Sequence, residues 1–218
     1  MFKTAFLRNI LFISLAIATI FPVYDLFIIH PRYQALLEEE TSQDAVRFGH
    51  HLIYSLQLDQ QPLDRKKLVP LIDAHDALIR EDPKMVKFRI FSRAGEIVYS
   101  TLPSEVGQVN EKDYFRNIVA QGQVYSKVVH KNTLTAERQM VKVDVVETYV
   151  PILTDGRFAG AMEIYYDITD RSQAIASLSR VSTSSLLIIA FGLLVTVIFT
   201  LRRAHRWVEG RDLSLIHI

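Results

Sequence analysis

Residues 141–166 read VKVDVVETYVPILTDGRFAGAMEIYY and predict an antiparallel hairpin. Valines alternate with charged residues over 141–145, as in a strand with one buried face, and Pro151 is expected to close that strand. Asp155-Gly156 is a strong signal for a two-residue hairpin turn. Phe158–Tyr166 then forms the returning strand, so this half of the chain predicts a β-sheet.

Two more strands are predicted upstream, where the hydrophobic period changes from helical to alternating after Asp82-Pro83. Apolar side chains at positions 86, 88 and 90 alternate with Lys87 and Arg89, which predicts a half-buried strand. Residues 93–96 form a turn, and Ile97–Thr101 returns as the partner strand. These strands extend the predicted sheet toward the N-terminus.

Helical periodicity of about 3.6 residues dominates the segments that come before and between these strands. With the helices on one face of an antiparallel sheet, the chain is expected to form an α+β domain of five strands and a long N-terminal helix. The remaining predicted elements are helices over Pro31–Leu58, Asp64–Arg80 and Glu111–Gln121, the last stopped by Gly122, and a strand over Gln123–Lys131.

An apolar stretch over residues 9–29 predicts a first transmembrane helix, preceded by a cytoplasmic N-terminus of residues 1–8. As a helix it spans about 32 Å, which exceeds a hydrocarbon core of about 30 Å. A cleaved signal peptide, with a site near Ala16-Ile17-Ala18, is the alternative. The apolar run continues past that site to Ile29, which favours an uncleaved anchor.

A second apolar stretch over residues 181–201 carries no charge and is followed by Arg202, Arg203 and Arg206. Short basic flanks stay cytoplasmic, and long loops are translocated largely regardless of charge. We therefore expect residues 202–212 inside and residues 30–180 outside, as a periplasmic or extracellular domain of a multi-pass protein in a bacterial inner membrane. A buried core helix is the alternative for residues 181–201.

The last six residues, 213–218, resemble the in-frame translation of a transposon end used as a sequencing adaptor. We expect them to be non-native and the natural chain to continue past Asp212. Upstream of the second apolar stretch, Asp170 and Gln173 predict a capping box at the start of a helix. That helix contains no Pro or Gly up to residue 191, so it links the last strand rigidly to the membrane.

Composition excludes several classes of function. The formal charge of +1 gives no reason to expect a nucleic-acid partner. Cysteine is absent, which removes disulfides and thiolate chemistry. His50 and His51 are adjacent and diverge on a helix, so they cannot easily share a metal. No catalytic motif is present, and we expect no cofactor, no metal and no catalytic domain in this chain.

Several motifs, in their order along the chain, resemble the Cache family of extracytoplasmic PAS-like sensor domains. The resemblance covers about residues 31–170 and is strongest in its second half. It implies a five-stranded antiparallel sheet with a small-molecule pocket on one face, in a bacterial histidine kinase, diguanylate cyclase or chemoreceptor. The motifs are GEIVYST at 95–101, DYF at 113–115, YVPI at 149–152 and DGRFAGAMEIYYDIT at 155–169.

The resemblance also implies where a ligand binds: between the second and third strands and on the strands that follow. Arginine offers a planar fork of donors suited to a carboxylate, which suggests an anionic ligand such as an organic acid. The Arg-x-Trp-Tyr element of amino-acid-binding members is absent, which argues against an amino acid. The candidate ligand-binding residues are Tyr114, Arg116, Lys127, His130 and Tyr149, with Lys142 as a further source of charge.

The sequence as a whole predicts the sensory part of a membrane receptor. This part is expected to bind a small extracytoplasmic molecule and to signal through the second transmembrane helix. The missing output is expected to be a histidine kinase, with a diguanylate cyclase or chemoreceptor output as alternatives. A homodimer in the lipid bilayer is the expected assembly. A structural or assembly protein with two anchors and no ligand is the competing interpretation.

Overall fold

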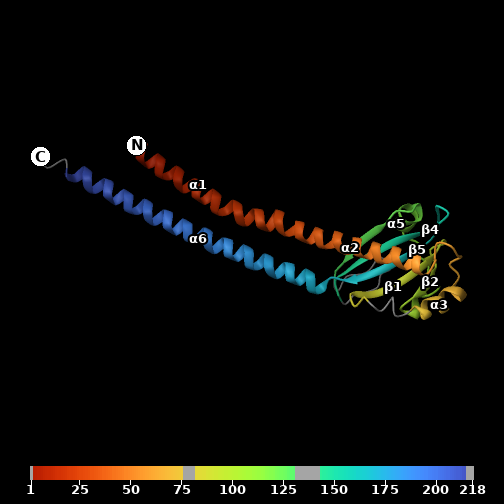
Figure 1. The fold of residues 1–218 in the computed structure, drawn as a ribbon. Helices are drawn as coiled ribbons and strands as arrows, with labels where there is room; N and C mark the ends of the chain where they lie inside the picture. The colour runs from red at the N-terminus through yellow and green to blue at the C-terminus, as the bar shows by residue number, and fades with distance from the viewer. Residues whose placement is uncertain (1, 76–81, 131–142, 215–218) are drawn as a thin grey trace. The chain divides into compact units, whose positions relative to one another are not determined.

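The computed structural model describes residues 2–75, 82–130 and 143–214 and divides into two compact units. One unit, residues 35–173, contains the sheet and the elements that pack on it. The other, residues 1–34 and 174–218, is built from helices. Figure 1 labels the elements of both units.

All five strands form one antiparallel sheet in the order β2-β1-β5-β4-β3. The α+β class, with a long N-terminal helix and a PAS-like five-stranded antiparallel sheet, is thereby confirmed. β5 lies at the centre, between β1 and β4. The strands are β1 (Met85–Ser92), β2 (Ile97–Ser100), β3 (Tyr125–Val129), β4 (Val145–Thr154) and β5 (Arg157–Asp167).

The β4–β5 turn is the predicted two-residue hairpin. Asp155 and Gly156 both have positive φ, 49° and 74°, between Thr154 and Arg157. Positive φ at both central residues is the requirement of the tight turns whose twist matches that of antiparallel strands. The hairpin is therefore confirmed, and its cause is local turn chemistry.

Pro151 does not close β4, contrary to the sequence prediction. It pairs with Ala161 of β5, and the strand continues to Thr154. On its other side β4 pairs with β3 only as far as Tyr149, opposite Tyr125. Beyond that point this side of β4 is an edge in the part of the sheet that the structure describes. Proline has no N–H to donate, and an edge is where a sheet tolerates it.

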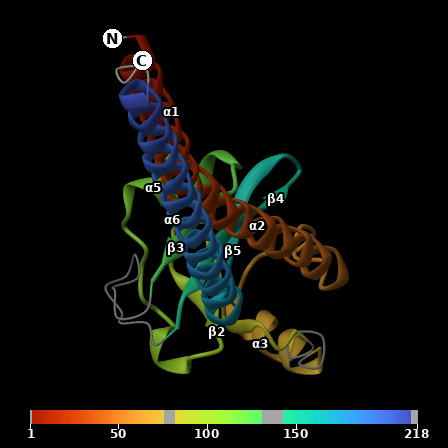
Figure 2. The same ribbon diagram turned by 90° about the vertical axis from the view of Figure 1, so that its left-hand side faces the viewer.

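One face of the sheet packs against helices α2 (His30–Ser55) and α3 (Arg65–Ala74). α3 lies beside β2 (Figures 1 and 2). α2 approaches closely at Gly49, where an added Cβ would lie 3.0 Å from Val150. Asp64 caps α3 by accepting a hydrogen bond from the Lys66 amide. Residues 76–80 of the predicted second helix lie outside the described ranges.

The predicted helix over 111–121 is shorter and divided. α5 covers Asp113–Asn117 and a 3₁₀ turn, η3, covers Val119–Gln121. Gly122 follows with φ 81°, so glycine ends this segment as predicted. Another 3₁₀ turn, η2 (Pro103–Glu105), follows β2. These elements pack toward the second face of the sheet, where Phe115 and Val119 join Tyr149 in one buried cluster.

α6 (Thr169–Ser214) begins before Asp170, the residue that the sequence predicts as its cap. Asp170 lies within its first turn, and Asp167 rather than Asp170 accepts a hydrogen bond from the first helical amide, that of Thr169. The Asp170 capping box is therefore wrong, although an acidic residue in the first turn still complements the helix dipole. β5 ends at Asp167, so one residue separates the sheet from this helix.

The helical unit contains α1 (Phe2–Tyr24), a π-helical turn η1 (Asp25–Ile29), the start of α2, and α6 from residue 174. Two helical runs, Arg8–Ser55 and Thr169–Arg203, are long and apolar enough to cross a membrane, by length and composition. Their large apolar side chains are mostly exposed, among them Phe12, Phe21, Ile188 and Phe191.

Candidate ligand site

The sheet face opposite α2 and α3 carries an unusual number of polar side chains, and we call it the polar face. Residues directly opposite each other on antiparallel strands point to the same face. Two adjacent rows of side chains therefore cross the sheet on this face. One row is Ser100, Arg89, Glu163, Tyr149 and Tyr125, and the other is Lys87, Tyr165, Glu147 and Lys127.

Arg89 lies at the middle of the polar face and has 0% exposure. Its Nε donates to Oε2 of Glu105 at 2.7 Å, and its Nη1 donates to Oε2 of Glu163 at 2.9 Å. Nη1 also reaches the hydroxyl of Tyr165 at 3.2 Å. A buried charge is tolerated only when it is paired and hydrogen-bonded, and Arg89 meets that condition through carboxylates from two elements.

Glu105 ties the η2 turn to this network. Its carboxylate accepts from Arg89 and, at 2.8 Å, from the Ser100 hydroxyl, and Lys87 Nζ lies 3.4 Å away. Burial by itself raises the pKa of Glu105. The hydrogen bonds from Arg89 and Ser100 and the charges of Arg89 and Lys87 outweigh burial and lower the pKa from 4.5 to about 2. Glu105 is therefore ionised throughout the physiological range.

The prediction that β1 is half-buried is wrong. Lys87 and Arg89 were expected on an exposed face, but they are 8% and 0% exposed. The cause is that both faces of the central strands are covered. The alternation of apolar and charged residues in β1 separates an apolar face from a buried polar one.

Beside this network, a chain of hydrogen bonds joins β4 to α5 and to the loop before α5. Asn110 Nδ2 donates to the Tyr114 hydroxyl at 3.1 Å, and the Tyr114 and Tyr149 hydroxyls lie 3.0 Å apart. The Tyr149 hydroxyl donates to Oε1 of Glu147 at 2.9 Å. The Tyr114 ring also stacks on the Tyr125 ring, with centroids 4.4 Å apart. We call Asn110, Tyr114, Tyr149 and Glu147 the tyrosine relay.

Three of the predicted site residues lie at the polar face and two lie elsewhere. Tyr114 and Tyr149 are in direct contact, and Lys127 lies on the same face opposite Glu147. Arg116 is exposed on α5. His130 follows β3, with its side chain 67% exposed and its Nδ1 3.6 Å from Asp144. Lys142 lies outside the described residues.

Sequence reasoning missed the carboxylates and cations of the polar face. They are Lys87, Arg89, Glu105, Glu147 and Glu163. A usable signal was present in the sequence. Within β1, β4 and β5, charged residues lie two positions from buried aromatic residues and therefore share a sheet face with them. Opposite charges on different strands, each in an otherwise apolar run, indicate pairing within a core. Strand order was needed to see which charges meet.

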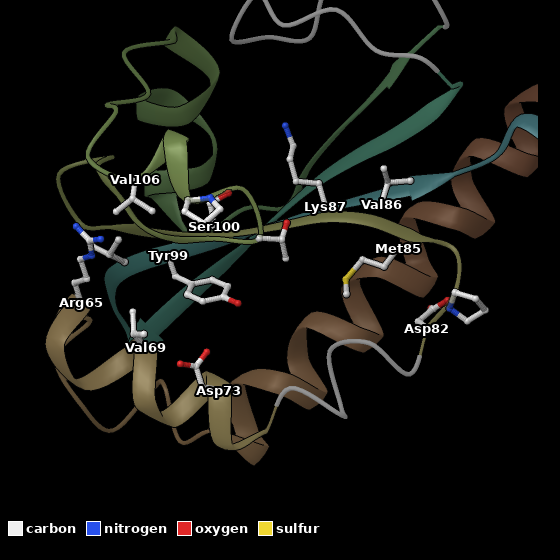
Figure 3. A pocket seen from close by; sticks show the side chains of 14 residues that line it. Arg65, Val69, Asp73, Asp82, Met85, Val86, Lys87, Tyr99, Ser100 and Val106 are labelled. Carbon is white, nitrogen blue, oxygen red and sulfur yellow. The ribbon is translucent and has the colours of Figure 1, made fainter.

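A cavity of about 630 Å³ lies at the β2 edge; residues of α3 line one part of it, and Lys87 and Ser100 of the polar face also line it. Figure 3 shows Tyr99 projecting from β2 toward α3, where Asp73 and Val69 line the opposite wall. Arg65 and Asp82 also line it. This edge cavity has room for a small molecule. Within the described ranges, neither place holds a group of three or more His, Asp or Glu residues arranged for a metal ion.

No protein-family model matches this chain. No curated protein matches it either. The class that the fold defines is a PAS-like α+β domain, from its own strand order and helix placement. Among the solved structures that match it are extracellular or sensor domains of receptors and histidine kinases.

Three of those structures illustrate the range. An extracellular ligand binding receptor from Desulfohalobium retbaense matches with TM-score 0.47 and 15% identity, over 70% of this chain and 27% of that one. The E. coli DcuS sensor domain has TM-score 0.39 and 11% identity, over 65% and 98%. The V. cholerae histidine kinase DctB sensor domain has 0.37 and 18%, over 63% and 58%. This chain thus spans about a quarter of the first protein's length.

Proposed function

We propose that this chain is the sensory part of a membrane receptor and binds a small molecule at the polar face. The observation that carries the proposal is the tyrosine relay beside the Arg89 network, which gathers donors and acceptors on a covered sheet face. Pockets with a few convergent polar groups among aromatic side chains are typical of small-molecule sites. The resemblance of the sequence to Cache domains points to the same face.

Two membrane crossings complete the proposal. Residues 9–29 and 181–201 cross the bilayer, and the sheet unit lies outside a bacterial inner membrane. Support comes from the two long apolar helices and from the basic residues Arg202, Arg203 and Arg206 after the second. Because only one residue separates β5 from α6, a displacement of the sheet reaches the membrane through a continuous helix.

We propose an organic acid that also carries a hydroxyl donor as the ligand class. The charge of a simple carboxylate matches that of Lys127. Arg89 does not take this role, because its guanidinium already binds the carboxylates of Glu105 and Glu163. The carboxylate of Glu147 lies on the same face and repels an anion that offers no donor. A hydroxy acid suits both Lys127 and Glu147. Its carboxylate lies toward Lys127, and its hydroxyl lies toward the tyrosine relay, which includes Glu147. The output of the receptor is proposed to be a histidine kinase.

The test measures thermal unfolding of the full chain in lipid nanodiscs with hydroxy acids, amino acids and simple carboxylates. A ligand at 100 times its Kd stabilises the folded state by about 2.7 kcal/mol. We expect a hydroxy acid to raise the Tm, and Tyr149→Phe, which removes one hydroxyl, to reduce that shift. Tyr99→Phe is the matched control, because it removes a hydroxyl from the edge cavity instead.

Each outcome of this test has a clear meaning. Loss of the shift in Tyr99→Phe, with Tyr149→Phe unaffected, would place the ligand in the edge cavity and refute the polar face as the site. No shift with any compound class would favour the competing function, a structural or assembly protein with two membrane anchors.

A further inference from the structure

The first apolar helix contains a carboxylate that no sensing role at the polar face explains. Asp25 opens the π-helical turn η1, between α1 and α2. Its Oδ2 accepts a hydrogen bond from the Thr183 hydroxyl at 2.7 Å, and its Oδ1 from the Ser182 hydroxyl at 3.4 Å. Both hydroxyls belong to α6, within the same helical unit. One carboxylate therefore joins the two apolar helices.

The surroundings of Asp25 make this pairing significant. An ionisable side chain within an apolar membrane segment is costly and marks a functional position. Single π-helical turns are rare and occur frequently at such positions. Pro22 lies three residues before Asp25, and its missing N–H already disturbs the regular hydrogen-bond ladder. The local backbone thus departs from α-helix at the residue that reaches the other helix.

A cavity of about 410 Å³ lies beside the pair. Asp25, Ile29 and Tyr33 line one side, and Leu178, Ser179 and Ser182 line the other. Ser179 is three residues before Ser182 and four before Thr183, so all three hydroxyls share one face of α6. Ser179 and Asp25 line this same cavity.

We propose that Asp25 is a latch with two hydrogen-bonding registers along α6. In the observed register it holds Thr183 and Ser182. In the second register α6 has moved about 4.5–6 Å along its axis, one helical turn, and Ser179 replaces them. Discrete one-turn shifts of this kind are an established form of switching between packed helices. The latch rests on the proposed membrane crossings and not on the identity of a ligand.

The test uses the absence of native cysteine in the chain. The full chain in lipid vesicles carries Ile29→Cys together with either Ile175→Cys or Leu178→Cys, and the two rates of disulfide formation are measured. Their ratio reports the axial position of α6. Thr183→Val weakens the observed register, so the ratio is expected to change about threefold or more, as one interhelical hydrogen bond allows. Ser179→Ala is expected to change it in the opposite direction.

Thr196→Val is the matched control, because the Thr196 hydroxyl donates to Gly192 of its own helix. Its ratio is expected to equal that of the parent. With Asp25→Leu the Thr183→Val effect should vanish, and with Asp25→Asn, which keeps an acceptor oxygen, it should persist in part. The latch is refuted if Thr183→Val behaves like Thr196→Val, or if its effect is unchanged in the Asp25→Leu background. These results do not depend on any ligand, so they stand apart from the ligand test.

Discussion

Arg89 shows how much a single buried charge constrains this domain. Its guanidinium is fully buried between the carboxylates of Glu105 and Glu163. Arg89→Met removes the cation and leaves two buried carboxylates without their main partner. A loss of about 3–5 kcal/mol in the free energy of unfolding is expected.

Urea unfolding of the full chain, followed by circular dichroism, measures this loss. Arg93→Met is the control, since Arg93 is exposed in the turn after β1. If both variants lost the same free energy, the Arg89 network would contribute no special stability.

Glu105 makes a second prediction at the residue scale, concerning pH. Its pKa in the folded chain is about 2, below the ordinary value of 4.5. Because the folded value is the lower one, Glu105 stabilises the fold above about pH 4.5, and this contribution is lost as the pH falls toward 2. The full contribution is on the order of 3 kcal/mol. The measurement is the free energy of unfolding between about pH 6 and about pH 2.5, a range that covers most of the loss of the Glu105 contribution. We expect this free energy to depend less on pH in Glu105→Gln than in the parent. Parallel curves would contradict the assignment.

Among the elements, β5 has no free space at Gly160. At Gly160 an added Cβ would lie 2.2 Å from the Phe91 carbonyl oxygen and 2.4 Å from Leu63 Cδ1. Gly160→Ala forces the backbone of β1 or β5 to move, and a loss of about 1–3 kcal/mol is expected. Gly192→Ala is the control, because nothing lies within 4 Å of its added Cβ. If thermal unfolding showed the same stability for both variants, the close packing of β1 against β5 at Gly160 would be contradicted.

The elements also separate what the sequence could predict from what it could not. Asp155-Gly156 predicted its turn correctly because the required positive φ is a property of two adjacent residues. The error at Pro151 arose because its place on the stretch of β4 that β3 does not pair with depends on strand order, which alternation alone does not provide. The same limit applies to Arg89, whose partner Glu163 lies 74 residues away. Tyr114 and Tyr149 were identified through the family resemblance and do meet in the structure, whereas Arg116 and His130 do not join them.

On the scale of the whole molecule, the account joins two claims that stand on different residues. The proposed ligand site lies at the polar face within residues 35–173, and the proposed Asp25 latch lies within the helical unit. α2 and α6 each run through both units, and α6 extends from Thr169 to Ser214. A sensor of this design requires that the sheet unit and the C-terminal end of α6 lie on opposite sides of a membrane.

Cysteine labelling of the expressed chain in intact bacterial spheroplasts tests that requirement most directly. The parent chain has no cysteine, so each introduced residue is the sole site in the protein for a membrane-impermeant maleimide. The account predicts that Gln121→Cys, exposed at the end of η3, is labelled in intact spheroplasts, and that Arg206→Cys is labelled only after lysis. Protection of position 121 until lysis, or labelling of position 206 in intact spheroplasts, would contradict it.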